Sequence, residues 1–425
     1  MTIAQATAPR KRKRRALVWM IVIVVALALL AAGGFAAASY LRMWAQGSPD
    51  ATEVAMPVAG PDSGLRRSFY SFGHTSTAIF LQTASPKVVE QRLPFQLGVV
   101  PQQFRVRVEN IDYLGDERLG DIEIQSVYLG HMTGEGEFET DVRLSGREET
   151  RNSKFVTDWF DQETMQLDTD EEYLLGISFS APAKTRVGVA PGVGWIRQGT
   201  ENGALVDDKN RGAFNRAGTY LDISIDYTFE GEDVPVVAVF GHSLNAGANQ
   251  NPDVPHKGEV EVWHQLWARD HGGSAASFAA AGAWTANFLA DSPKWDRATD
   301  VDADYVAIWA SSSDLVAGTT PDEVGSYWVA LIAEARERWP DAQIVAFTEP
   351  PRGADGEGEQ FRRQWNDFLR TSPEQIDVLV DTDKLLADPK NRRVLSPDYD
   401  GDGSHFSPAG HEAVARAFAK AISAS

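Results

Sequence analysis

The pattern of apolar and polar residues changes near residue 232 and divides the chain beyond residue 66 into two predicted domains. Before this point, short runs alternate between apolar and polar residues, most clearly FRVRVENI (104–111), DIEIQSVYL (121–129), EEYLLGISF (171–179) and LDISIDYTF (221–229). Alternation with a period of two predicts strands, and the Gly, Asp and Asn residues between the runs mark turns. Because no long helical pattern intervenes, residues 67–231 are predicted to form an antiparallel β-sandwich domain.

Beyond residue 232 the apolar residues form continuous runs, at VPVVAVF (234–240), YVAIWA (305–310), AQIVAF (342–347) and IDVLVD (376–381). Such runs are typical of strands that are buried on both faces of a parallel sheet. Between them the apolar period becomes helical, as in residues 321–339, and residues 411–422 predict a final helix. Alternating strands and helices predict a layered α/β domain over residues 232–425, with its chemistry at the carboxyl ends of the strands.

The first 40 residues carry a membrane signal. A basic run, Arg10–Arg15, ends a predicted cytoplasmic tail (1–15), and the 25 residues from 16 to 40 contain no charged side chain. A helix that rises about 1.5 Å per residue over this length spans the hydrocarbon core of roughly 30 Å. We therefore expect a transmembrane signal-anchor that leaves the rest of the chain outside the cytoplasm. Cleavage as a signal peptide near Ala36–Ala38 is the alternative, and residues 41–66 are predicted to be a linker.

Composition and charge narrow the classes of function. The 425 residues include 40 Lys and Arg against 60 Asp and Glu, a net charge of −20, and the six cations of the basic run leave −26 for the remainder. Because phosphate backbones need a basic face, nucleic acid is excluded as the main partner, and anionic substrates are disfavoured. The sequence contains no cysteine, which excludes disulfides, thiolate metal sites and a cysteine nucleophile.

The residues with candidate chemistry follow the first apolar run and precede the last helix. Ser243 follows closely after the run 234–240 and Gly241. It therefore lies at the carboxyl end of a predicted buried strand, and ligands bind at this edge of a parallel sheet. Asp402 and His405 lie three positions apart on a Gly-containing loop. An acyl-transfer site needs a nucleophile, a base that takes its proton, and an acid that orients the base. These three residues provide one group of each kind.

Taken together, these segments resemble the SGNH (GDSL-type) hydrolases over residues 232–425. The matching blocks, in the order and spacing of the family, are Gly241-His242-Ser243, Gly282, Ser311-Ser312-Ser313-Asp314 and Asp402-Gly403-Ser404-His405. The segment SPAGHEAVARAF after the last block also fits the closing helix of the family. The resemblance implies a flavodoxin-like, three-layer α/β domain, and the preceding sandwich is similar to the β-rich domain of some exported members.

The resemblance also implies a role for each matching residue. Ser243 would be the nucleophile, His405 the base and Asp402 the acid that orients the base. The backbone N–H groups of Ser243 and Gly282, together with the side chain of Ser313, would hold the oxyanion. Such a site needs no metal and no organic cofactor.

The sequence departs from the family pattern at three positions. The first block has His242 where the family has Asp, and the third block has Ser311 and Ser313 where the family has Gly and Asn. A hydroxyl reaches less far than an amide, and the loss of one oxyanion donor typically lowers turnover by about 10²–10³-fold. Asn245 and Asn287 are candidate substitute donors. We expect His242 to be a packing or hydrogen-bonding residue and not a second base.

Two further patterns have ordinary interpretations. Asp398, Asp400 and Asp402 alternate as at the start of a calcium loop, but the twelfth position is Ala409 instead of Glu, which excludes an EF-hand. No metal site is predicted. Several tryptophans of the α/β domain are candidates for a sugar groove, although core packing is the expected role for most of them: Trp263, Trp267, Trp284, Trp295 and Trp309.

The sequence therefore favours a membrane-anchored, extracytoplasmic serine esterase that hydrolyses carboxylic esters. Its expected partners are an ester-bearing small molecule or an acylated glycan, and the cytoplasmic membrane through residues 16–40. Two alternatives remain open. The same site would serve an acyltransferase with a sugar acceptor, and the changes at His242, Ser311 and Ser313 motivate a degenerate, non-catalytic SGNH domain that acts in envelope binding.

Overall fold

The computed structural model describes residues 53–61, 64–81, 88–200, 214–247, 258–353, 355–371 and 373–424. The predicted cytoplasmic tail (1–15) and transmembrane segment (16–40) lie outside these ranges. Among the helices that the structure describes, none is both long enough and apolar enough to cross a membrane. The end of the predicted linker takes part in the fold, because Val58 forms a bridge with Trp159.

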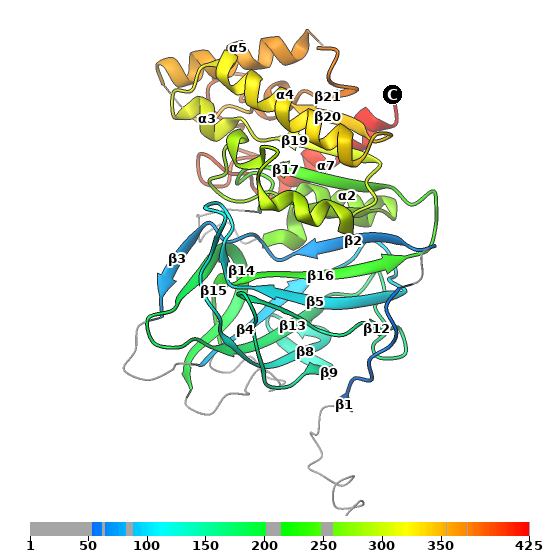
Figure 1. Ribbon diagram of the computed structural model, residues 1–425. Coiled ribbons are helices and arrows are strands. Elements are labelled where there is room, and N and C mark those ends of the chain that lie inside the picture. Colours follow the sequence, from blue (N-terminus) through cyan, green and yellow to red (C-terminus); the bar gives the residue numbers. More distant parts are fainter. Residues whose placement is uncertain are drawn as a thin grey trace, which may run out of the picture. The chain divides into compact units, whose positions relative to one another are not determined.

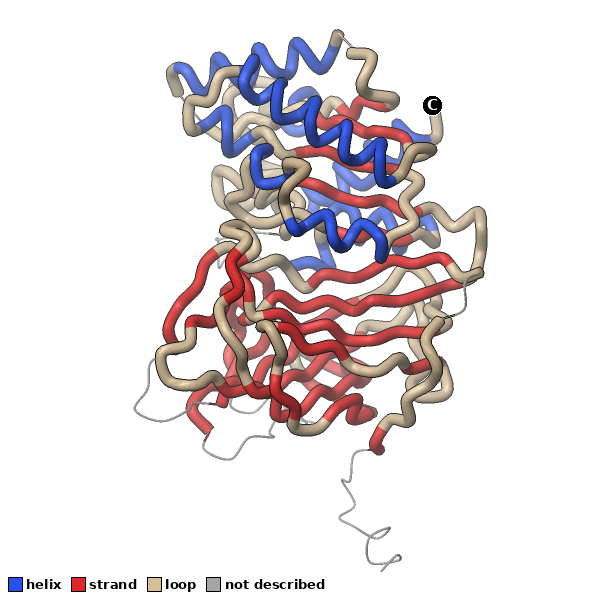
Figure 2. The backbone as a smooth tube through the Cα atoms, viewed as in Figure 1, coloured by secondary structure: helices blue, strands red, loops and turns tan. Residues whose placement is uncertain are grey.

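Two large sheets form most of the described amino-terminal part (Figures 1 and 2), and a two-stranded sheet accompanies them. In the described chain, the first sheet has nine strands, in the order β1 (Glu53–Val54), β9 (Glu137–Ser145), β8 (Glu123–Gly134), β13 (Tyr173–Ser180), β4 (Val88–Phe95), β14 (Arg186–Thr200) and β15 (Asn215–Tyr220), with β10 (Glu148–Glu149) beside β8 and β3 (Thr77–Phe80) beside β14. The second has five, in the order β11 (Lys154–Val156), β5 (Gln103–Glu109), β16 (Asp222–Phe229) and β2 (Arg66–Ser71), with β12 (Phe160–Asp161) beside β5. Apart from the parallel pair β1–β9, the pairs described in these sheets are antiparallel, which confirms the predicted antiparallel β-rich region.

The alternation along β16 gives this strand two different buried faces. Its apolar side chains belong to the core that the two sheets share, and they are Ile223, Ile225, Tyr227 and Phe229. The polar side chains between them are also buried. Asp226 bonds to Arg107 of β5 at 2.9 Å and to Arg297 of the 3₁₀ helix η3 (Pro293–Asp300) at 2.7 Å. The polar face of this sheet is thus covered by the α/β part instead of by solvent.

The predicted parallel sheet is confirmed, and within the described residues it has one strand more than the sequence pattern indicated. Its order is β18 (Ser274–Ser277), β17 (Val236–Gly241), β19 (Tyr305–Trp309), β20 (Gln343–Phe347) and β21 (Val378–Val380). The additional strand, β18, has the sequence SAAS, whose small and polar residues form no apolar run. Its residues are buried because β18 lies next to β2, where the Ser274 hydroxyl donates to the Ser68 hydroxyl at 2.6 Å.

Helices cover both faces of the parallel sheet (Figure 1), because successive residues of each strand point to opposite faces. Val239 of β17 packs in the cluster that contains residues of α2 (Trp263–His271) and α7 (Pro408–Ile422). The next residue, Phe240, packs in the cluster that contains residues of α4 (Pro321–Arg338) and α5 (Glu357–Arg370). The described helices are α2 (Trp263–His271), α3 (Ser312–Val316), α4 (Pro321–Arg338), α5 (Glu357–Arg370), α6 (Thr382–Leu386) and α7 (Pro408–Ile422), with the 3₁₀ helices η1 (Gly258–Glu261) and η2 (Thr285–Phe288).

The ends of α4 follow from its sequence. Thr320 and Glu323 form a reciprocal capping box, and Pro321 occupies the first turn, where its missing N–H costs no helical hydrogen bond. The apolar face predicted for residues 321–339 is buried and consists of Val324, Trp328, Leu331, Ile332 and Ala335. The helices cover the faces of the sheet, and the loops after β17, β19 and β20 lie at its carboxyl edge, where ligands bind in folds of this kind.

Candidate active site

Ser243 lies on the turn that follows β17, at the carboxyl edge of the parallel sheet. Gly241 ends the strand, and a Cβ at this position would collide with the carbonyl oxygen of Trp309 on β19 and with the side-chain amide of Asn245. The turn closes through the N–H of Asn245, which donates to the carbonyl of His242 at 2.9 Å. The missing side chain at position 241 therefore lets the chain turn tightly against β19 and present Ser243 at the sheet edge.

The loop before α7 is shaped by the carboxylate of Asp402. Its Oδ1 accepts the backbone N–H groups of Ser404 at 3.0 Å and of His405 at 2.8 Å. Its Oδ2 accepts the ring Nδ1–H of His405 at 2.8 Å. One carboxylate thus fixes both the backbone turn and the direction of the imidazole. Because an ionised carboxylate only accepts hydrogen bonds, Nδ1 carries the ring proton and Nε2 is left as an acceptor.

The structure brings Ser243, His405 and Asp402 into one hydrogen-bonded series. The Ser243 hydroxyl lies 3.0 Å from His405 Nε2 and is positioned to donate to it. Burial lowers the pKa of His405 below its ordinary value, although the hydrogen bond to Asp402 acts in the opposite direction. A neutral imidazole with an accepting Nε2 is the form that takes a proton from a serine hydroxyl near neutral pH.

Gly282 lies on the segment that continues from β18 along the end of β17. The N–H of Ala280 donates to the carbonyl of Gly241 at 3.1 Å, so this segment still runs beside the strand that carries the Ser243 turn. Gly282 has a φ of +82°, a conformation that residues with a side chain rarely adopt. The glycine is therefore required by the path of the backbone at this edge.

A hairpin of the amino-terminal part, β6 (Ile111–Asp112) and β7 (Glu117–Arg118), braces the same segment. The Tyr113 hydroxyl donates to the carbonyl of Phe278 at 2.9 Å, and the amide of Asn287 donates to the carbonyl of Leu114 at 3.2 Å. Leu114 is also the neighbour that a side chain at Gly282 would meet. The two ends of the Gly282 segment are thus fixed by residues that belong to the β-rich part of the chain.

Ser313 lies in the first turn of α3, on the loop that follows β19. Its neighbour Asp314 accepts the backbone N–H of Thr285 at 2.9 Å and the hydroxyl of Thr285 at 3.1 Å, which ties α3 to the Gly282 segment. Among the hydrogen bonds of the described residues, none joins the Ser313 hydroxyl to Ser243. Through Asp314, the position that the family fills with an oxyanion donor is held next to the Gly282 segment.

Neither candidate substitute donor is assigned to the oxyanion by its contacts. The amide of Asn245 donates to the carbonyl of Trp309 at 3.0 Å, and its oxygen accepts the indole N–H of Trp263 at 2.8 Å. Asn287 holds the hairpin through its amide, and its oxygen accepts the N–H of Trp284 at 2.8 Å. Both side chains bind the scaffold around the site.

Glu349 and Arg352, which the sequence analysis did not single out, follow β20 in the segment TEPPR (348–352). The rule that groups at the carboxyl ends of parallel strands share one edge applied to this strand as well as to β17. This rule was the only sequence signal for the two residues, because neither belongs to a motif found in the sequence.

Glu349 is fully buried and connects the loops after β17 and β19. Its carboxylate accepts His242 Nε2 at 3.2 Å, the indole N–H of Trp309 at 3.1 Å, and the backbone N–H and hydroxyl of Ser311 at 3.1 and 2.8 Å. Burial acts to raise the pKa of Glu349, but His242 and Ser311 hold it below its ordinary value. Two of the three departures from the family pattern thus bind the same carboxylate.

We expect Glu349→Ala to lower the free energy of unfolding by about 3–5 kcal/mol, because it leaves His242 and the N–H of Ser311 buried without their acceptor. Glu349→Gln keeps one acceptor oxygen and should fall between this variant and the wild type. Urea unfolding at neutral pH measures the difference. As a control, Glu374→Ala removes an exposed carboxylate and should change stability by no more than about 0.5 kcal/mol. Equal stability of Glu349→Ala and the wild type would show that this network does not stabilise the fold.

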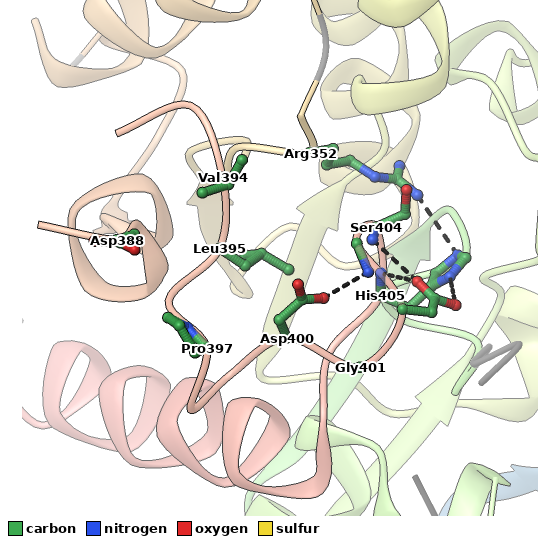
Figure 3. A pocket seen from close by; sticks show the side chains of 11 residues that line it. Arg352, Asp388, Val394, Leu395, Pro397, Asp400, Gly401, Ser404 and His405 are labelled. Carbon is green, nitrogen blue, oxygen red and sulfur yellow. Dashed lines mark hydrogen bonds and ion pairs between the residues drawn. The ribbon is translucent and has the colours of Figure 1, made fainter. Parts of the chain in front are cut away.

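Arg352 reaches from the loop after β20 to the side chains of Ser243 and His405. Its Nη2 lies 3.4 Å from Ser243 Oγ and 3.5 Å from His405 Nε2, and its Nη1 donates to the Ser312 hydroxyl at 3.1 Å. Figure 3 shows the guanidinium pointing toward the His405 ring. Burial lowers the pKa of Arg352, while Glu349 and Asp402 act in the opposite direction. The site therefore contains a partly buried cation beside Ser243.

A cleft of about 1050 Å³ opens beside His405 and Arg352 (Figure 3). Its wall combines carboxylates, apolar side chains and backbone of the loop before α7, and its other lining residues are Asp388, Val394, Leu395, Pro397, Asp400, Gly401, Asp402, Gly403 and Ser404. A cleft of this size accommodates a ligand at least as large as a typical small molecule. The carboxylates of Asp400 and Asp402 both accept hydrogen bonds from the backbone of this loop. Asp400 accepts the N–H of Gly403 at 2.6 Å, and Asp402 accepts those of Ser404 and His405.

Comparison with known proteins supports the assignment of the α/β part. Residues 239–413 match the GDSL-like Lipase/Acylhydrolase family, and the match includes all four blocks of the predicted resemblance, which is thereby confirmed. No curated protein matches the chain. Similar solved structures include a family two carbohydrate esterase from Clostridium thermocellum in complex with cellohexaose, which is 12% identical over 84% of this chain and 94% of that chain, with a TM-score of 0.36. A carbohydrate acetylesterase from Sinorhizobium meliloti is 15% identical over 45% of this chain and 99% of that chain, with a TM-score of 0.36.

Proposed function

We propose that this chain, whose residues 239–413 match the GDSL-like lipase/acylhydrolase family, is a membrane-anchored serine esterase that removes acyl groups from neutral, hydroxyl-rich substrates such as acylated glycans. The observation that carries the proposal is the hydrogen-bonded series from Asp402 through His405 to Ser243, at the carboxyl edge of the parallel sheet. A serine hydroxyl alone is a weak nucleophile, and a base within hydrogen-bonding distance is what activates it.

In the first half of the proposed reaction, Ser243 Oγ attacks the acyl carbonyl carbon while its proton moves to His405 Nε2. Asp402 stabilises the imidazolium through its bond to Nδ1. The bond between the carbonyl carbon and the alkoxy oxygen then breaks, and His405 gives its proton to the departing alcohol. The product of this half-reaction is an ester between the acyl group and Ser243.

In the second half, His405 takes a proton from a water molecule, and the water oxygen adds to the acyl carbon. The bond from that carbon to Ser243 Oγ breaks, and His405 returns the proton to the serine. The carboxylic acid leaves, and both residues regain their starting protonation states. No step requires an electron acceptor or a second substrate other than water.

The preference for a neutral, glycan-like substrate rests on charge and on one exposed aromatic ring. The chain beyond the basic run carries a net charge of −26, and an acidic surface repels anionic substrates. Trp284, two positions after Gly282, is 42% exposed, whereas Trp263, Trp267, Trp295 and Trp309 are buried. An exposed indole on the segment that carries Gly282 offers an apolar surface against which the C–H face of a sugar ring packs.

Membrane anchoring is proposed from residues 16–40, which are uncharged and follow a basic run. With the amino terminus in the cytoplasm, the esterase domain acts outside it. Protease added to intact protoplasts should then degrade the domain and leave an amino-terminal tag protected. Protection of the whole chain would contradict this orientation.

The esterase proposal is tested with detergent-solubilised full-length protein. We expect hydrolysis of an aryl acetate, release of acetate from an acetylated glycan, and covalent labelling by a fluorophosphonate whose attachment site maps to Ser243 by mass spectrometry. Product analysis with a free sugar acceptor present separates hydrolysis, which yields the carboxylic acid, from acyl transfer. A folded protein that neither hydrolyses these esters nor reacts with the fluorophosphonate would refute the proposal.

A further inference from the structure

The proposed esterase site has Ser313 where the family has the asparagine that donates to the oxyanion, and a hydroxyl reaches less far than an amide. We propose that Arg352 fills this role, and that its guanidinium donates to the oxyanion of the tetrahedral intermediate. The inference rests on the proposed esterase function, since it concerns the same site. It assigns a catalytic role to a residue outside the four blocks that identify the family.

The first argument is the position of the guanidinium. Its Nη2 lies 3.4 Å from Ser243 Oγ, and its Nη1 donates to the hydroxyl of Ser312, the residue immediately before Ser313. The group therefore spans the distance from the nucleophile to the loop where the missing donor would stand. The oxyanion forms on the carbon to which Ser243 Oγ bonds. A donor that already reaches Oγ in the resting site is consequently within reach of the oxyanion.

The second argument is charge. Within the described residues, Arg352 has no carboxylate at ion-pair distance, although it is partly buried. The two carboxylates whose fields act on it have other partners: Glu349 binds His242 and Ser311, and Asp402 binds His405. A cation that is partly removed from water and has no counter-ion is less favourable in the resting protein than one that is paired. The anion that would balance it is the one that the reaction creates, which is the arrangement expected of a preorganised oxyanion donor.

The same position gives Arg352 a measurable effect on the base. Its Nη2 lies 3.5 Å from His405 Nε2, so its charge opposes protonation of the ring. The groups that act on His405 are Asp402 on its own loop, which raises its pKa, and Arg352 after β20 and His242 after β17, which add to the lowering caused by burial. Removing the Arg352 charge should therefore raise the pKa of His405. A residue that only supports the fold would not move this pKa.

The test compares Arg352→Gln, Arg352→Lys and Arg352→Ala in full-length protein with a neutral aryl acetate. We expect kcat to fall about 10²–10³-fold in Arg352→Gln while KM stays within threefold, and the acid limb of kcat/KM to move to higher pH. Fluorophosphonate labelling should slow in parallel, because the phosphoryl oxygen occupies the oxyanion position. Arg352→Lys keeps the positive charge but lacks the planar guanidinium with its paired N–H donors, and it should retain more activity than Arg352→Gln. The control Arg416→Gln removes an exposed cation from α7 and should leave kcat and the pH profile unchanged.

Chemical rescue addresses the case in which loss of the side chain disturbs folding. Added guanidinium ion, at concentrations below those that denature the wild type, should restore part of the kcat of Arg352→Ala and should not stimulate Ser243→Ala. Unchanged kcat in Arg352→Gln would overturn the inference. A loss confined to KM, and seen only with an ester that carries a carboxylate, would also overturn it, because Arg352 would then bind an anionic group of the substrate.

The outcomes separate this inference from the function on which it rests. An active wild type whose Arg352 variants keep their kcat and pH profile contradicts the oxyanion role alone. A wild type that neither hydrolyses esters nor reacts with the fluorophosphonate contradicts the esterase function, and the oxyanion role falls with it.

Discussion

Replacing Ser243 with alanine should lower the kcat for ester hydrolysis by at least about 10⁴-fold and abolish fluorophosphonate labelling. The variant removes the atom that would bond to the acyl carbon, while His405 and Asp402 keep their mutual hydrogen bond. The residual rate would come from binding and from the oxyanion donors alone. Steady-state hydrolysis of an aryl acetate measures the loss, with the enzyme concentration fixed by absorbance.

The same experiment needs evidence that Ser243→Ala still folds. Ser243 is 8% exposed, and within the described part of the chain its hydroxyl bonds only to His405 and Arg352, so the thermal midpoint should stay close to that of the wild type. Ser326→Ala, on the exposed face of α4, is the matched control and should keep full activity. Hydrolysis by Ser243→Ala at more than a hundredth of the wild-type rate would exclude Ser243 as the nucleophile.

The parts of the fold that sequence patterns predicted are those in which burial and apolar character coincide. The strand runs of the parallel sheet and the apolar face of α4 are of this kind, since their buried side chains are themselves apolar. β4 is different, because Glu90, Gln91 and Arg92 are fully buried within it. Arg92 packs over the rings of Phe138 and Phe214, which belong to distant parts of the sequence. A polar residue that is buried by partners far along the chain leaves no periodic signal.

The same distinction applies to the site. Ser243 is marked by the end of an apolar run, and Asp402 and His405 by a spacing that closes one short loop, so local sequence was sufficient to nominate them. Glu349 has no such mark, because its partner His242 lies 107 positions away. His242 and Ser311 were departures from a family pattern when each was considered alone. Their shared contact with Glu349 makes them parts of one network, which weakens the argument for a degenerate site.

Replacing Asp402 with asparagine should lower kcat by about 10⁴-fold while leaving the loop before α7 intact. The amide oxygen still accepts the backbone N–H groups of Ser404 and His405, so the turn has what it needs to form. The amide nitrogen, however, is a donor and would face His405 Nδ1. The ring then favours the tautomer with its proton on Nε2, which cannot accept the proton of Ser243. The structural effect is small, and the effect on the chemical step is large.

Asp398→Asn supplies the matched control, because it makes the same chemical change at an exposed position of the same loop and should keep activity within about threefold of the wild type. The pH profile provides a second criterion. The hydrogen bond to Asp402 raises the pKa of His405 against the lowering by burial, so Asp402→Asn should move the acid limb of the residual kcat/KM to lower pH. Arg352→Gln is expected to move it to higher pH, since that variant removes a cation instead of an anion. Shifts of the two limbs in the same direction would contradict the arrangement of charges around His405 from which both expectations follow.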